Sequence, residues 1–205
     1  MILAAKFSKP EPCVTGEFYE WVRANIESGD VLLSRENLRM TNLLIPGFWC
    51  HVGICIWIGD TPWVVEAVGA GVRKQTLAQF VLSKDHLMVV RKNNMSAEAR
   101  AAGGQKTLTQ IGKPYDYQLY YSSDDKEKDK ASFHEDSTKA FYCAELSYWG
   151  LEEAAEEFKQ PWDFELRETL GVMTIAPNDY DGATSDGKFK EIARFQYNVA
   201  TFSEG

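Results

Sequence analysis

Three side chains of this sequence have the types needed for nucleophilic catalysis: Cys143, His51 and Glu66. Cys143 lies at the start of an amphipathic stretch, Lys139 to Phe158, whose pattern is typical of a helix. The N-terminus of a helix favours a thiolate over a thiol, and its first backbone N–H groups can bind an oxyanion beside the sulfur. By position alone, a buried structural cysteine is an equally good interpretation.

A cysteine nucleophile needs a base within hydrogen-bond reach, and the base needs a group that orients it. His51 begins an apolar, β-branched stretch, residues 51–59, which predicts a central strand. The end of a strand is where a sheet presents side chains to a site. His86 precedes a later strand in a polar context and His134 lies in a charged segment, so His51 is the better candidate base.

Glu66 interrupts the apolar stretch 63–69, where a carboxylate is unfavourable unless it is paired. A turn at 59–62 separates this stretch from the previous one, so we expect residues 51–58 and 63–68 to form a hairpin. The hairpin would bring Glu66 close to His51, where a carboxylate can fix the tautomer of the imidazole. The alternative is a carboxylate on an edge strand that faces water.

The remaining pattern predicts one α+β domain without internal repeats. Further helices are expected at 15–28 and 94–111, where Gly103-Gly104 either breaks the helix or allows close packing, and further strands at 30–34 and 86–92. Residues 35–49 form a connection with mixed signals, and 70–82 a turn and a short helix. Residues 124–139 predict a charged, exposed, mobile loop. The tail has strand-like pieces at 171–177 and 189–199 around a polar loop.

Five ordered landmarks resemble the permuted NlpC/P60 family, the YiiX/YebB-like branch of the papain-like cysteine hydrolases. They are GDVLLSRE, HVGICIWIG, VVEAVGAGV, IGKPYD and FYCAEL, and they span roughly Gly29 to Leu151. The tail, TIAPNDYDGATSDGKF, also resembles the end of such proteins. The resemblance implies a papain-like, circularly permuted fold with an antiparallel sheet packed against helices. The chain would be a single domain, 1–205, with its core at about 16–172 and a C-terminal extension at 173–205.

The resemblance also implies roles for residues. Cys143 would be the nucleophile, His51 the base and Glu66 the orienting acid of a hydrolase that cleaves amide bonds through a thioester. Its substrate would be a cell-wall-type peptide or an acyl-amide. Tyr142 and Tyr115 are candidate substrate-binding or oxyanion-side residues, with packing as the alternative. Asp30 of the Gly-Asp pair is expected to form a turn.

Two other functions stay open at this point. The same superfamily includes lecithin:retinol acyltransferase-like enzymes, so a lipid acyltransferase or thioesterase could use the same triad. Those enzymes carry an NCEHF-like motif where this chain has YCAEL, which weakens this alternative. A non-catalytic binding module is the third interpretation, and the intact triad argues against it.

Composition excludes several classes of partner. The net charge is −8 and the basic residues are scattered, which argues against nucleic-acid binding. Four cysteines and three histidines lack the spacing of a zinc site, and no cofactor is expected. No apolar run approaches the ~20 residues of a membrane span. Lys6 and Pro10 interrupt the N-terminus too early for a signal peptide, so we expect a cytoplasmic protein, with leaderless export left open.

Overall fold

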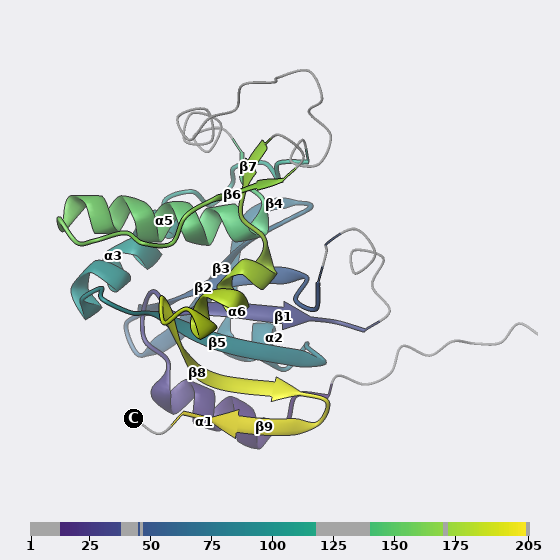
Figure 1. Cartoon of the computed structure of the whole chain (residues 1–205). Helices are drawn as coiled ribbons and strands as arrows, with labels where there is room; N and C mark the ends of the chain where they lie inside the picture. The colour runs from purple at the N-terminus through teal and green to yellow at the C-terminus, as the bar shows by residue number, and fades with distance from the viewer. Residues whose placement is uncertain (1–12, 38–44, 46, 118–139, 170–171, 204–205) are drawn as a thin grey trace, which may run out of the picture.

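The computed structural model describes residues 13–37, 45, 47–117, 140–169 and 172–203. Within them, a seven-stranded sheet in the order β4-β3-β2-β1-β5-β8-β9 has helices on both faces (Figure 1). All neighbouring strands pair antiparallel, which confirms the predicted α+β class. The segment 124–139, predicted to be a mobile loop, and most of the connection 35–49 lie outside the described residues.

The central strands of the sheet are apolar because helices cover both of their faces. In β1, for example, Val31 and Leu33 belong to the core under one helix layer, and Leu32 belongs to the core under the other. The strands of the main sheet are β1 (Val31–Arg35), β2 (His51–Ile58), β3 (Thr61–Val68), β4 (Gly71–Thr76), β5 (His86–Lys92), β8 (Phe189–Gln196) and β9 (Val199–Phe202). A separate hairpin consists of β6 (Arg167–Thr169) and β7 (Val172–Thr174).

The helices form two layers. Helices α1 (Gly16–Asn25) and α2 (Leu77–Val81) pack on one face of the sheet. Helices α3 (Ala97–Leu108), α5 (Cys143–Glu157) and α6 (Pro177–Ser185) pack on the other face. The predicted helix that begins at Cys143 is therefore present, and it lies beside α3 against the larger of the two cores (Figure 1).

Small residues allow α3 and α5 to approach closely. Helix α3 continues unbroken through Gly103 and Gly104. A Cβ atom on Gly103 would lie 2.9 Å from Cδ2 of Leu151, and one on Gly150 would lie 2.8 Å from the carbonyl oxygen of Gly103. Both distances are too short for ordinary packing, so glycine is required at this crossing. The close crossing fixes the position of α5 over the sheet.

Two segments differ from the prediction. Residues 71–76 form β4, where a turn was expected before the short helix; its one large apolar side chain, Val72, gives little strand signal. Residues 177–185 form α6, where a polar loop was expected. Pro177 begins this helix, the Asp179 side chain accepts a hydrogen bond from the Ala176 N–H at 2.7 Å, and Tyr180 is buried.

The C-terminal residues join the same sheet as the rest of the chain. Strand β8 pairs with β5 from Phe189 to Phe195, and β9 pairs with β8 at the edge. Residues 173–203, predicted to be an extension, thus contribute α6 and two strands to one architecture. No helix in the described ranges has the length and apolar character needed to cross a membrane.

Candidate active site

The hairpin of β2 and β3 brings His51 and Glu66 together. Its register pairs Gly53 with Glu66, which places the carboxylate two residues from the start of β2. The predicted hairpin is therefore confirmed. Nε2 of His51 lies 2.7 Å from Oε2 of Glu66, and the Glu66 side chain is only 1% exposed.

Strand β4 supplies the other partners of Glu66. Oε1 accepts hydrogen bonds from Nε of Arg73 at 2.9 Å and from Nε2 of Gln75 at 2.8 Å, and Nη2 of Arg73 lies 2.8 Å away. Sequence reasoning missed both residues because it missed β4. Their spacing of two, on a strand that pairs antiparallel with β3 and sets Arg73 opposite Glu66, was the signal that could have found them.

These contacts shift the pKa values of His51 and Glu66 in opposite directions. Burial disfavours the imidazolium, but hydrogen bonds with Cys143 and Glu66 outweigh burial and raise the pKa of His51 to about 9. Burial likewise disfavours the Glu66 carboxylate, but the hydrogen bond from His51 and the charge of Arg73 lower its pKa to about 2. His51 and Glu66 therefore form an ion pair throughout the neutral range.

Cys143 is the first residue of α5, and its interaction with His51 is one of the causes that raise the pKa of the histidine. The cysteine is 3% exposed and borders a cavity of about 220 Å³. The residues that line this cavity come from segments far apart in the sequence: Ile45, Cys50, His51, Glu66, Ala67, Val68, Gly69, Arg73, Lys84, Tyr115, Tyr117 and Cys143. We call it the cysteine cavity.

The start of α5 is held by hydrogen bonds on both sides of Cys143. The backbone N–H of Tyr142 donates to Oε2 of Glu145 at 3.1 Å, and the hydroxyl of Tyr180 donates to the carbonyl of Ala144 at 3.0 Å. The Tyr142 hydroxyl accepts from the backbone N–H of Ile175 at 3.1 Å. Its side chain is buried and is not among the residues that line the cysteine cavity, so the role predicted for Tyr142 in substrate binding stays a prediction.

Tyr115 lies at the wall of the cysteine cavity. It forms an isolated parallel bridge with Phe141, whose N–H donates to the carbonyl of Pro114 at 3.2 Å. The Tyr115 ring packs against Tyr117 with a centroid distance of 4.9 Å, and the Tyr117 hydroxyl donates to the carbonyl of Gly69 at 2.8 Å. The bridge fixes Tyr115 close to the start of α5.

The other candidates from the sequence occupy different surroundings. The Cys50 thiol also lines the cysteine cavity, but it donates to the carbonyl of Phe48 at 3.3 Å, and burial raises its pKa. His86 packs against Phe48 away from the cavity, and burial lowers its pKa.

Asp30 accepts from the N–H of Glu27 at 2.8 Å, as expected for a turn, and it also pairs with Arg91. His134 lies outside the described residues.

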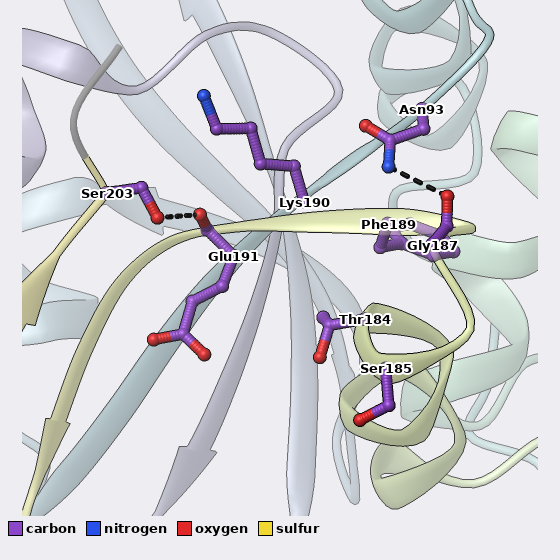
Figure 2. A pocket seen from close by; sticks show the side chains of 8 residues that line it. All are labelled: Asn93, Thr184, Ser185, Gly187, Phe189, Lys190, Glu191 and Ser203. Atoms are coloured by element: carbon purple, nitrogen blue, oxygen red, sulfur yellow. Dashed lines mark hydrogen bonds between the residues drawn. The ribbon is translucent and has the colours of Figure 1, made fainter.

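A second hollow lies between α6, β8 and the end of the chain (Figure 2). It is shallow and has a volume of about 480 Å³. Asn93 donates to the carbonyl of Gly187 at 2.9 Å, and the Ser203 hydroxyl donates to the carbonyl of Glu191. Its lining is polar: Asn93, Thr184, Ser185, Gly187, Phe189, Lys190, Glu191 and Ser203. We call it the β8 hollow.

Comparison with known families accounts for the architecture around His51 and Glu66. The model of the permuted papain-like amidases, the YaeF/YiiX or C92 family, matches residues 25–128, about half of the chain. The chain belongs to this family. The predicted resemblance and the prediction of a papain-like cysteine amidase or peptidase are confirmed. The matched range contains His51 and Glu66 and ends before Cys143.

A solved structure supports the fold of this amidase. The crystal structure of metalloprotein yiiX from Escherichia coli O157:H7 is similar with a TM-score of 0.52 and 18% identity. The likeness covers 78% of this chain and 81% of the other chain. In the described part of the present chain, no group of three or more His, Cys, Asp or Glu side chains is arranged to hold a metal ion. A comparison with curated protein sequences gave no significant match.

Proposed function

We propose that this amidase hydrolyses an amide bond with Cys143 as nucleophile, His51 as acid and base, and Glu66 as the orienting acid. One observation carries the proposal: His51 lies 2.7 Å from a buried carboxylate, and it lines the same cavity as Cys143, which interacts with it electrostatically. A base held by a third group beside a nucleophile is the arrangement that cysteine catalysis needs.

The charges support a specific order of steps. With the pKa of His51 raised to about 9, the imidazolium is present at neutral pH and can hold the Cys143 thiolate as an ion pair. The thiolate attacks the substrate carbonyl, and the imidazolium gives its proton to the leaving amine as the C–N bond breaks. Neutral His51 then takes a proton from water, the hydroxide attacks the thioester, and the thiolate leaves.

The start of α5 is suited to stabilise the negative charge that develops on the carbonyl oxygen. Cys143 is the first helical residue, and the first backbone N–H groups of a helix have no intrahelical acceptor. These N–H groups can donate to an oxyanion beside the sulfur. Tyr115 at the cavity wall, fixed to Phe141 two residues before the nucleophile, is a second candidate for this position.

The test is covalent labelling of the intact chain. A cysteine-directed activity probe at neutral pH should label Cys143 ahead of the other three cysteines, with the labelled peptide identified by mass spectrometry. Cys50→Ser is the matched control because Cys50 lines the same cavity and burial raises its pKa. This variant should keep the label, whereas Cys143→Ser should lose it.

A substrate panel then separates the bond types. Amides of peptides and of acylated amines, and lipid esters, should be offered to the wild-type chain and to Cys143→Ser. A peptidyl or acyl-amide-derived adduct on Cys143 supports the proposal, whereas a fatty acyl adduct obtained only from lipid esters would replace it with the acyltransferase alternative. Labelling that spreads equally over all four cysteines would contradict a catalytic role for Cys143.

A further inference from the structure

The charged side chains of the cysteine cavity offer a substrate hydrogen-bond donors rather than acceptors. Among the residues that line it, Glu66 is the carboxylate, and both of its oxygens already accept from protein donors. Oε2 faces His51, and Oε1 takes Arg73 and Gln75. A substrate ammonium would therefore have to displace these donors to reach Glu66. The carboxylate serves the histidine and is a poor binding site for a substrate cation.

Two cations line the same cavity, and each is paired with one carboxylate: Arg73 with Glu66 and Lys84 with Glu36. Arg73 contacts Glu66 through Nε and Nη2, and its side chain is 56% exposed. A guanidinium has five N–H donors, so part of this one faces solvent at the cavity rim. Lys84 lines the cavity from the segment after α2, is 5% exposed, and forms a buried salt bridge of 2.7 Å with Glu36, which is not among the lining residues. Its ammonium has three donors.

We propose that Arg73 and Lys84 form an anion-binding subsite of the cysteine cavity, which selects amide substrates that carry a carboxylate or similar anionic group near the scissile bond. This inference rests on the proposed function, because it assigns the substrate class of the same site. The chain as a whole carries a net charge of −8, whereas the described residues of this cavity wall include two lysine or arginine side chains and one carboxylate, Glu66. A field of this kind concentrates anions at a cleft.

Arg73 has two roles in this arrangement, and an experiment must separate them. It holds Glu66, which affects every reaction at Cys143, and it presents charge to the cavity, which affects only charged reagents. Two alkylating reagents of nearly the same size make the separation: iodoacetamide is neutral and iodoacetate is an anion. The ratio of their rates at Cys143 cancels any change in nucleophile reactivity and keeps the effect of reagent charge.

The experiment measures both alkylation rates at Cys143 in the full chain by mass spectrometry, with the denatured chain as reference. The folded protein should show a higher iodoacetate-to-iodoacetamide ratio than the denatured protein. Arg73→Gln should lower the folded ratio by about threefold to tenfold, the size expected for one charge across a partly solvated cleft. Arg73→Lys should keep most of the ratio. Added salt should lower the ratio in the wild type and much less in Arg73→Gln.

Lys190→Gln is the matched control, because Lys190 is an exposed cation in the β8 hollow. It should leave the ratio unchanged. An unchanged ratio in Arg73→Gln, or a drop of equal size in Lys190→Gln, would overturn the subsite while leaving the nucleophile intact. Failure of Cys143 to react with either reagent would instead overturn the proposed function, and the subsite with it.

The same charge preference should appear in turnover. For an amide that the protein hydrolyses, the free acid and its carboxamide analogue should differ in KM, with the acid binding more tightly. Arg73→Gln should remove most of this difference. A lower KM for the carboxamide in the wild-type protein would contradict the proposal.

Discussion

The cysteine cavity and the β8 hollow differ in what their polar side chains bind. In the cysteine cavity, His51 and Arg73 both bind Glu66, so the charges of these side chains are coupled. In the β8 hollow, Asn93 and Ser203 donate to uncharged backbone carbonyls, and the carboxylate of Glu191 pairs with Arg194, which is not among the lining residues (Figure 2). The β8 hollow is the larger of the two, at about 480 Å³ against about 220 Å³. Coupled titratable groups, and not volume, therefore identify the candidate site.

The two regions also differ in the elements that build them. The cysteine cavity lies where the start of a helix meets a hairpin, so that backbone donors and side chains from β2, β3 and β4 converge. The β8 hollow follows the end of α6 and the edge of the sheet. Substitutions in matched positions of the two regions should therefore have very different effects.

The largest difference is expected for the base. His51→Ala should lower kcat/KM by about 10³-fold or more, because it removes the group that holds the thiolate and protonates the leaving amine. Ser185→Ala in the β8 hollow is the control and should stay within twofold of the wild type. Steady-state kinetics on an identified amide substrate make the comparison. Equal losses in the two variants would remove the distinction between the two regions.

The second largest effect concerns the charge of Glu66. Glu66→Gln should lower kcat by about 10²-fold. Cys143 and the carboxylate together raise the pKa of His51 to about 9, so loss of the carboxylate lowers that pKa and the imidazolium is lost at a lower pH. The alkaline limb of the kcat/KM profile should therefore move below its wild-type position near pH 9. A limb that stays in place would show that Glu66 does not set the charge of His51.

A third comparison tests the packing of α5, the helix that begins at Cys143, against α3. Gly150→Ala forces a Cβ against Cγ2 of Thr107 at 2.5 Å and should lower the free energy of unfolding by about 1–3 kcal/mol. Gly182→Ala, in α6 above the β8 hollow, meets no atom within 4 Å and should raise it by about 0.5–1 kcal/mol. Chemical denaturation of both variants measures the difference. Equal changes would show that the close crossing of α3 and α5 is not required.

The smallest effect is expected at the second donor to Glu66. Gln75→Ala removes one hydrogen bond of 2.8 Å from Oε1 while Arg73 remains, so kcat should fall about fivefold with KM unchanged. Lys74→Ala is the control on the same strand, because neighbouring side chains of a strand point to opposite faces and Lys74 packs over Trp63 instead. A fall in both variants would indicate general damage to β4.

The sequence predicted the hairpin that brings Glu66 to His51 better than it predicted the elements around that hairpin. Alternation and the turn at 59–62 were sufficient to place Glu66 beside His51, because a hairpin register follows from a short turn. The partners on β4 were not predictable in the same way, since Arg73 and Gln75 are explained only by the buried carboxylate that they contact. Helix α6 was missed because its sequence is rich in turn-forming residues, and its stability comes from burying Tyr180.

The bridge between Tyr115 and Phe141 has a consequence for the diversification of such enzymes. The backbone N–H of Asp116 donates to the carbonyl of Phe141 at 3.0 Å. Together with the bridge, this bond holds the segment at Tyr115 and Asp116 against Phe141, two residues before Cys143. The entropy of closing a loop changes only slowly with its length. Insertions and deletions between these two anchors can therefore accumulate during evolution without displacing the nucleophile.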